Sequence, residues 1–173
     1  MARPIQASIR TRADDPSPSE GVTAAAFREA LAAWASGVAV VAASDGGDVE
    51  ALTATAFTPL SADPPLVLVC LGNDAALLYV IEDAGRFTVN LLGHDDRRAA
   101  SAFAQRMTLE PGRWTLDPDP ALAGALVSLV CRLRETHPGG DHRIVVGEVE
   151  RVVLGDADAD PLLFFRREYR TLA

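Results

Sequence analysis

Lysine is absent from this sequence of 173 residues, because all 16 basic residues are arginine. The absence excludes chemistry that requires a lysine, such as a Schiff base, a pyridoxal site or the phosphate-binding lysine of a P-loop. Arginine remains a good donor for phosphates and carboxylates. The 24 acidic residues give a net charge of −8, which argues against nucleic acid or an anionic membrane surface as the main partner.

Cysteine and long apolar runs are also scarce. Cys70 and Cys131 both lie in apolar runs, so we interpret them as buried side chains. With three histidines and no CxxC pair, no structural zinc site is expected. No apolar run approaches the roughly 18 residues of a membrane span, and no apolar segment follows Arg3, Arg10 and Arg12 as it would in a secretory signal. The sequence predicts a soluble cytoplasmic protein that binds neither membrane nor nucleic acid.

Common catalytic motifs are missing as well. The sequence contains no GxGxxG, GxSxG or HExxH motif and no EF-hand loop. We interpret the cluster of Asp156, Asp158 and Asp160 as a solvated turn. The run His94-Asp95-Asp96 is typical of a helix N-terminus. The residues therefore predict neither a catalytic acid–base pair nor a metal site.

The hydrophobic pattern predicts a mostly β chain with peripheral helices. Residues 1–20 form an expected flexible N-terminal arm, and residues 21–173 form one domain. Thr23 is the expected N-cap of a helix over 24–35, and further helices are expected over 74–84 and 95–106. Strands are expected over 38–43, 49–57, 66–71, 87–92, 126–136, 143–154 and 162–165. Because strands and helices do not alternate regularly, a closed or split antiparallel barrel is favoured over a Rossmann sheet.

Three segments are candidates for chemistry, and each has a simpler alternative. Residues 53–66 are small and hydroxyl-rich, so their backbone could approach a flat ligand, or they could form an ordinary strand and loop. The turn Gly140-Asp141-His142 could offer a histidine to a ligand, or its aspartate could simply cap the turn. Residues 164–170 combine aromatic and arginine side chains that could line a cofactor site or pack the C-terminus onto the core.

Together these segments resemble the short-chain flavin reductases, whose members have an FMN-binding split barrel and supply reduced flavin to two-component monooxygenases. The resemblance runs from about residue 27 to residue 170 and rests on motifs in the family's order. They are Trp34-Ala35-Ser36-Gly37, Thr53-Ala54, Phe57-Thr58, Asp63-Pro64-Pro65, Gly85-Arg86-Phe87, Val89-Asn90-Leu91, Phe103-Ala104, Gly140-Asp141-His142, Gly147-Glu148-Val149, Pro161-Leu162-Leu163 and Tyr169-Arg170.

The resemblance implies a split antiparallel β-barrel of Greek-key type that forms a homodimer, with FMN or FAD near the subunit interface. It implies hydride transfer from NADH or NADPH to the flavin, and a transient monooxygenase partner. The flavin-binding residues that it implies are Ser36, Gly37, Val38, Thr53, Ala54, Thr55, Ala56, Phe57, Thr58, Pro59, Leu60, Ser61, Asn90, Phe103 and Ala104. The residues that it places near the nicotinamide cofactor are His142, Arg166, Arg167, Glu168 and Tyr169.

The sequence also departs from the family pattern. Thr55-Ala56 stand where Asn-Ser is frequent, Pro59 and Ala100 stand where serine is frequent, and Arg167 replaces a common glycine. The missing hydroxyls leave open a loosely bound flavin that acts as a substrate. They also leave open two alternatives: a flavoprotein of the same fold that acts on a small organic substrate, and a non-catalytic flavin-binding subunit.

Overall fold

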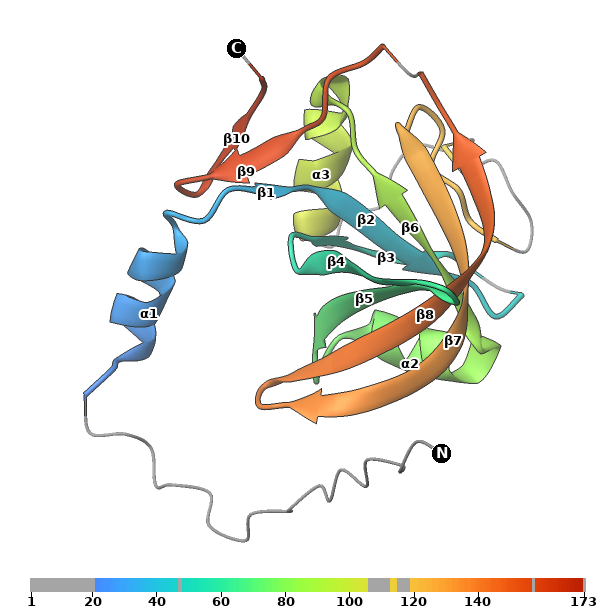
Figure 1. Cartoon of the computed structure of the whole chain (residues 1–173), viewed down its shortest axis with the longest axis horizontal. Helices are drawn as coiled ribbons and strands as arrows, with labels where there is room; N and C mark the ends of the chain where they lie inside the picture. Colours follow the sequence, from blue (N-terminus) through green and yellow to red (C-terminus); the bar gives the residue numbers. More distant parts are fainter. Residues whose placement is uncertain (1–20, 47, 106–112, 115–118, 157, 173) are drawn as a thin grey trace, which may run out of the picture. The chain divides into compact units, whose positions relative to one another are not determined.

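The computed structural model describes residues 21–46, 48–105, 113–114, 119–156 and 158–172 (Figure 1). The chain divides into a unit that ends at Leu31 and a unit that begins at Ala32. The arm expected over residues 1–20 lies outside the described residues. None of the described helices is long and apolar enough to cross a membrane.

Helix α1 (Ala24–Leu31) is the described helix of the first unit. Thr23 caps it as expected, because its Oγ1 accepts a hydrogen bond of 3.1 Å from the backbone N–H of Ala26. The helix ends four residues before the predicted limit of 24–35. Phe27 and Leu31 lie one turn apart, and both are more than half exposed, so their apolar face is open to solvent.

The second unit is built on a seven-stranded antiparallel sheet whose strand order is β3-β2-β6-β7-β8-β5-β4. Its strands are β2 (Ala39–Ala43), β3 (Glu50–Ala54), β4 (Phe57–Ala62), β5 (Pro65–Gly72), β6 (Arg86–Leu91), β7 (Val127–Gly139) and β8 (His142–Leu154). A small second sheet has the order β1-β9-β10. It contains β1 (Ser36–Gly37), β9 (Leu163–Phe165) and β10 (Glu168–Arg170).

The large sheet curls into a barrel because its two edge strands are consecutive in the chain. Only Thr55 and Ala56 separate the end of β3 from the start of β4, and such a link spans about 11 Å at most. The carbonyl oxygen of Ala56 also accepts a hydrogen bond of 3.0 Å from the backbone N–H of Cys70 in β5. Since β3 and β4 are not paired with each other, the barrel is split between them. The predicted fold class, mostly β with a split antiparallel barrel, is confirmed.

The barrel interior is a close-packed apolar core. It contains Ala39, Val41, Val69, Leu71, Phe87, Val89, Cys131 and Val145, and α2 (Ala76–Ala84) adds Leu77, Leu78 and Ile81. Burial raises the pKa of the Cys131 thiol to about 12, with a smaller contribution from the charge of Glu150. Cys131 is buried as predicted, whereas the same prediction for Cys70 was wrong, because Cys70 is only half-buried.

Gly147 in β8 makes the packing of the Phe87 ring possible. A Cβ atom at this position would lie 2.5 Å from Cζ of Phe87 and 2.9 Å from Cβ of Cys131. Both distances are far below ordinary carbon–carbon contact. The absence of a side chain at Gly147 thus leaves the space that the ring occupies.

A second apolar cluster lies under α3 (Arg97–Ala104), which packs against β2 and β3 (Figure 1). It contains Val38, Val40, Leu92, Ala99, Ala100, Phe103, Leu122, Ala125 and Leu162. The helix predicted over 95–106 is preceded by a 3₁₀ turn, His94–Asp96. Oδ2 of Asp96 accepts a hydrogen bond of 3.1 Å from the N–H of Gly93, the residue before that turn, so this acidic run lies at a helix N-terminus as expected.

The prediction for residues 49–66 was wrong in detail. One strand over 49–57 is two strands, and the segment expected as a loop contains β4. Pro59 lies in β4, which is an edge strand of the sheet, and the pairing of β4 with β5 shifts between Pro59 and Ser61. Proline is tolerated at such an edge because no neighbouring strand requires its missing N–H.

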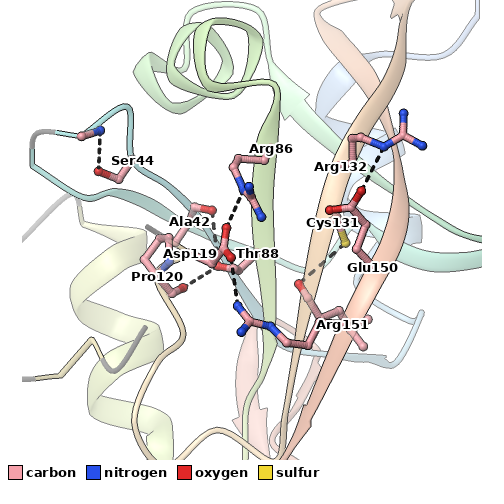
Figure 2. A network of polar contacts seen from close by, with 12 residues as sticks. Ala42, Ser44, Arg86, Thr88, Asp119, Pro120, Cys131, Arg132, Glu150 and Arg151 are labelled. Atoms are coloured by element: carbon pink, nitrogen blue, oxygen red, sulfur yellow. Dashed lines mark hydrogen bonds and ion pairs between the residues drawn. The ribbon is translucent and has the colours of Figure 1, made fainter. Parts of the chain in front are cut away.

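Ion pairs to the buried carboxylate of Asp119 hold the segment that follows the undescribed residues 115–118. Asp119 forms ion pairs with two strands of the barrel: its Oδ1 lies 2.5 Å from Nε of Arg86, and its Oδ2 accepts a hydrogen bond of 2.9 Å from Nη2 of Arg151 (Figure 2). Oγ1 of Thr88 donates a hydrogen bond of 2.5 Å to the carbonyl oxygen of Pro120. These contacts fasten residues 119–120 to β6 and β8.

Candidate active site

The split of the barrel lies between β3 and β4, and several of the predicted site residues there are exposed. Thr55, Ala56, Thr58, Pro59 and Leu60 are exposed, and Phe57 and Ser61 are half-buried. The sheet pairs β4 with β5 alone and β3 with β2 alone, so each strand turns one backbone edge away from the sheet. Such edges offer N–H donors and C=O acceptors to a ligand. The segment 53–61 carries no charged side chain, which suits an uncharged flat ring with polar edges.

Thr53 ties this segment to α3. Its hydroxyl donates a hydrogen bond of 2.7 Å to the carbonyl oxygen of Ala100. The hydroxyl of Thr58, in contrast, makes only a local bond of 3.3 Å to the carbonyl oxygen of Pro59. Thr53 therefore helps to hold α3 beside the split, while Thr58 stays on the exposed strand edge.

Asn90 was predicted at the flavin site, and the structure shows it fully buried with all its amide capacity used. Its Nδ2 donates to Val40 O at 3.1 Å and to Thr88 Oγ1 at 3.2 Å. Its Oδ1 accepts from Leu122 N–H at 2.8 Å and from Ser128 Oγ at 2.7 Å. Two donors and two acceptor positions are all that this side chain has. Asn90 joins β6 to its neighbours, and its contact with a flavin stays a prediction.

The residues predicted near the start of the barrel gather with the C-terminal hairpin. Ser36 pairs with Phe164, and the rings of Phe164 and Tyr169 lie 5.5 Å apart. Val38 and Phe103 are buried in the cluster against which Phe164 and Tyr169 pack. These segments thus meet around α3 although they are far apart in the sequence.

Arg97 fastens the C-terminal hairpin to α3. Its Nη2 donates a hydrogen bond of 2.5 Å to the carbonyl oxygen of Tyr169, and its guanidinium lies 5.7 Å from the centroid of the Tyr169 ring. The turn between β9 and β10 contains Arg166 and Arg167, whose φ angles are 51° and 64°. Residues other than glycine rarely adopt this left-handed conformation. A glycine at position 167, as the resemblance would have it, would fit this turn without strain.

His142 lies at the tip of the β7–β8 hairpin and is exposed. Its Nδ1 is 2.7 Å from Oδ1 of Asp141. This hydrogen bond and the charge of His142 hold the pKa of the Asp141 carboxyl below its usual range. Gly140, which precedes Asp141 in the turn, has a φ of 73°, a conformation that glycine adopts without steric cost.

A family model matches most of the chain. Residues 31–173 match the family model of the flavin reductase like domain. The chain belongs to the flavin reductase-like family. The oxidoreductase class and the flavin and nicotinamide cofactors expected from the sequence agree with this assignment.

Curated relatives of this flavin reductase-like protein are reductases of known type. It is 49% identical over 151 residues to the reductase component of a 4-hydroxyphenylacetate 3-monooxygenase from Thermus thermophilus, covering 85% of this chain and 95% of the relative. It is 38% identical to an NADH-dependent flavin reductase from a Rhodococcus species, covering 87% and 88% of the two chains. Among solved structures, the NADH:FAD oxidoreductase SgcE6 of Streptomyces globisporus, in complex with NAD and FAD fragments, matches with a TM-score of 0.80 and 30% identity. That match covers 86% of this chain and 92% of the other.

The residues predicted near the nicotinamide cofactor lie on two anchored turns. The turn that carries His142 is held by Asn73, and the turn that carries Arg166 and Arg167 is held by Arg97. That both turns meet one nicotinamide cofactor stays a prediction. The roles of Asn73 and Arg97 were not predicted from the sequence, because their contacts join residues about 70 positions apart and no local sequence pattern indicates them. Among the described residues, no group of three histidine, cysteine, aspartate or glutamate side chains could hold a metal ion.

Proposed function

We propose that this protein oxidises NADH or NADPH, reduces FMN or FAD, and releases the reduced flavin to a partner monooxygenase. The observation that carries the proposal is the uncharged segment at the split, where two strand edges without sheet partners and exposed hydroxyl residues lie together. Family membership supplies the activity class. The curated relative from Thermus thermophilus is itself a monooxygenase reductase component.

The donor set at the split fits a flavin. Its ring system is flat and uncharged, with polar atoms along one edge, and the exposed backbone of β4 could donate to those atoms. Leu60, whose side chain is 49% exposed, provides apolar surface for the ring. The hydroxyls of Thr55 and Ser61 add donors without adding charge. A bound flavin would supply the ability to accept a hydride from reduced nicotinamide.

The protein contributes binding and orientation to this reaction. Residues 53–61 hold the flavin, and donors near its polar edge favour the negative charge that grows there on reduction. His142 orients the nicotinamide cofactor, with the β9–β10 turn as a second contact. No side chain has to move a proton in hydride transfer between two cofactors, so the absence of a predicted acid–base pair agrees with the proposed reaction.

We also propose that the protein works as a homodimer in the cytoplasm. Val152 and Leu154 at the end of β8 are 53% and 75% exposed, and Phe27 and Leu31 add an exposed apolar face on α1. Apolar surface of this kind is typical of protein interfaces. Sedimentation equilibrium should give twice the monomer mass of 18.3 kDa, and a monomer at micromolar concentration would contradict the dimer.

The activity is tested by mixing purified protein with each of the four pairings of NADH or NADPH with FMN or FAD. We expect loss of nicotinamide absorbance with at least one pairing, at a rate proportional to the protein concentration. If no pairing oxidises nicotinamide faster than a protein-free mixture, the proposed function is wrong.

A desalting experiment distinguishes released flavin from retained flavin. Protein loaded with FMN or FAD and passed through a gel-filtration column should emerge colourless if flavin exchanges as a substrate. A yellow protein after this step would contradict release and favour a flavoprotein that keeps its cofactor.

A further inference from the structure

The turn that carries His142 is held by one residue of another loop, Asn73. In the β7–β8 hairpin, Gly139 pairs with His142, so only Gly140 and Asp141 form the turn. The side-chain Nδ2 of Asn73 donates a hydrogen bond of 3.0 Å to the carbonyl oxygen of Gly140. The backbone N–H of Asn73 donates one of 3.1 Å to the carbonyl oxygen of Asp141. Both turn carbonyls thus accept from the same residue.

Asn73 is in place to do this because it directly follows β5. The last residue of β5, Gly72, is paired with His142, the first residue of β8. Asn73 therefore continues the β5–β8 pairing past its end, first with its backbone and then with its side chain. The turn is fixed to the barrel at the residue next to the predicted nicotinamide contact.

The orientation of the His142 ring depends on this turn. Its Nδ1 bonds to Oδ1 of Asp141 at 2.7 Å, and the carboxylate accepts, so Nδ1 carries the proton in this contact. Asp141 is 95% exposed and the His142 side chain 48%, so the position of the ring depends mainly on the backbone of the turn. A displacement of about 1 Å in a positioning group is enough to weaken a reaction between bound cofactors.

We propose that Asn73 is a positioning residue for the nicotinamide half of the reaction, acting through the backbone of the turn that carries His142. This inference rests on the proposed function, which gives His142 its contact with the nicotinamide cofactor. Asn73 itself touches no cofactor in this scheme. The hydrogen bond that its side chain donates to Gly140 fixes the orientation of the His142 ring.

Two substitutions test the role: Asn73→Asp keeps the shape of the side chain but replaces the donor to Gly140 by a negative charge, and Asn73→Ala removes the donor without adding charge. We expect Asn73→Asp and Asn73→Ala to lower kcat/KM for NADH about three- to tenfold, the effect of losing one exposed hydrogen bond. The KM for flavin and the Tm should change little. Glu135→Gln is the matched control, since it removes a charge on the same hairpin, from an exposed pair with His137 at 3.1 Å.

A double-mutant cycle with His142→Ala separates positioning from other effects. Because Asn73 acts through His142, Asn73→Asp should have no further effect on kcat/KM for NADH in the His142→Ala protein. Full additivity, or an unchanged kcat/KM in Asn73→Asp alone, would overturn the positioning role while leaving the reductase activity standing. A wild-type protein without turnover would instead overturn the proposed function and the inference with it.

Discussion

Gly147→Ala is expected to destabilise the barrel strongly, because the space for a side chain is already taken. The new Cβ would lie 2.5 Å and 2.8 Å from two atoms of the Phe87 ring and 2.9 Å from Cβ of Cys131. To restore ordinary contact the ring would have to move by about 1 Å, in a core where it is 2% exposed. Cys131 cannot yield, because its Cβ is fixed by the backbone of β7.

The expected cost lies at the upper end of the range for overpacking, about 3 kcal/mol. For a domain of this size, each kcal/mol lowers the Tm by about 2–4 °C, so the Tm should fall by about 6–12 °C. Thermal unfolding followed by circular dichroism measures the change. Gly37→Ala is the matched control, since no atom lies within 4 Å of its added Cβ, and its Tm should stay within a few degrees of the wild type.

Phe87→Leu provides the test of the cause. It removes the ring atoms that a Cβ at position 147 would meet, so the double variant Gly147→Ala with Phe87→Leu should be more stable than the sum of the single effects. An unchanged Tm in Gly147→Ala, or strict additivity in the double variant, would refute the steric explanation.

Three further predictions concern single side chains. Asp119→Asn should lower the free energy of unfolding by about 1–3 kcal/mol, because it removes the charge of a buried carboxylate that is paired with two arginines. Glu150→Gln, in an exposed pair of the same region (Figure 2), should lower it by less than about 1 kcal/mol. Urea denaturation measures both changes, and equal effects would contradict this prediction. Arg167→Gly should be at least about 1 kcal/mol more stable than Arg167→Val, because the φ angle at position 167 is 64° and β-branched residues tolerate this left-handed conformation worst. Equal melting temperatures of the two variants would argue against strain in the turn. Cys131 should resist iodoacetamide at pH 8 until the protein unfolds, since its pKa is raised to about 12 from 9.0, and stability should fall as the pH rises through that interval; mass spectrometry that finds native Cys131 alkylated would refute it.

The fold class could be predicted from the sequence, because β-branched and apolar runs indicate most of the strands. The β-branched runs that became β2 and β8 and the apolar run of β5 were predicted close to their observed bounds. The strand β4 was not predicted, because Pro59 and small polar residues weaken its pattern and its pairing with β5 decides its conformation. Strand β10 was missed for a similar reason, since three residues carry no periodicity and pairing with β9 creates the strand.

The candidate site was only partly accessible. The uncharged segment 53–61 and the exposed His142 can be recognised from residue types and from the family resemblance. The burial of Asn90 could not be predicted from the sequence, because it depends on neighbouring strands that meet only in the folded barrel. The clamp by Asn73 is likewise invisible in the sequence, since it joins positions 67 residues apart.

The short link through Thr55 and Ala56 has a consequence for biosynthesis. The first two hairpins to leave the ribosome, β2–β3 and β4–β5, become opposite borders of one sheet, and the strands between them are translated later. The β2–β3 hairpin cannot pair with β6, and the β4–β5 hairpin cannot pair with β8, until those later strands have been synthesised. We therefore expect nascent chains that stop before residue 142 to expose strand edges with unpaired backbone N–H and C=O groups, and to depend on chaperones.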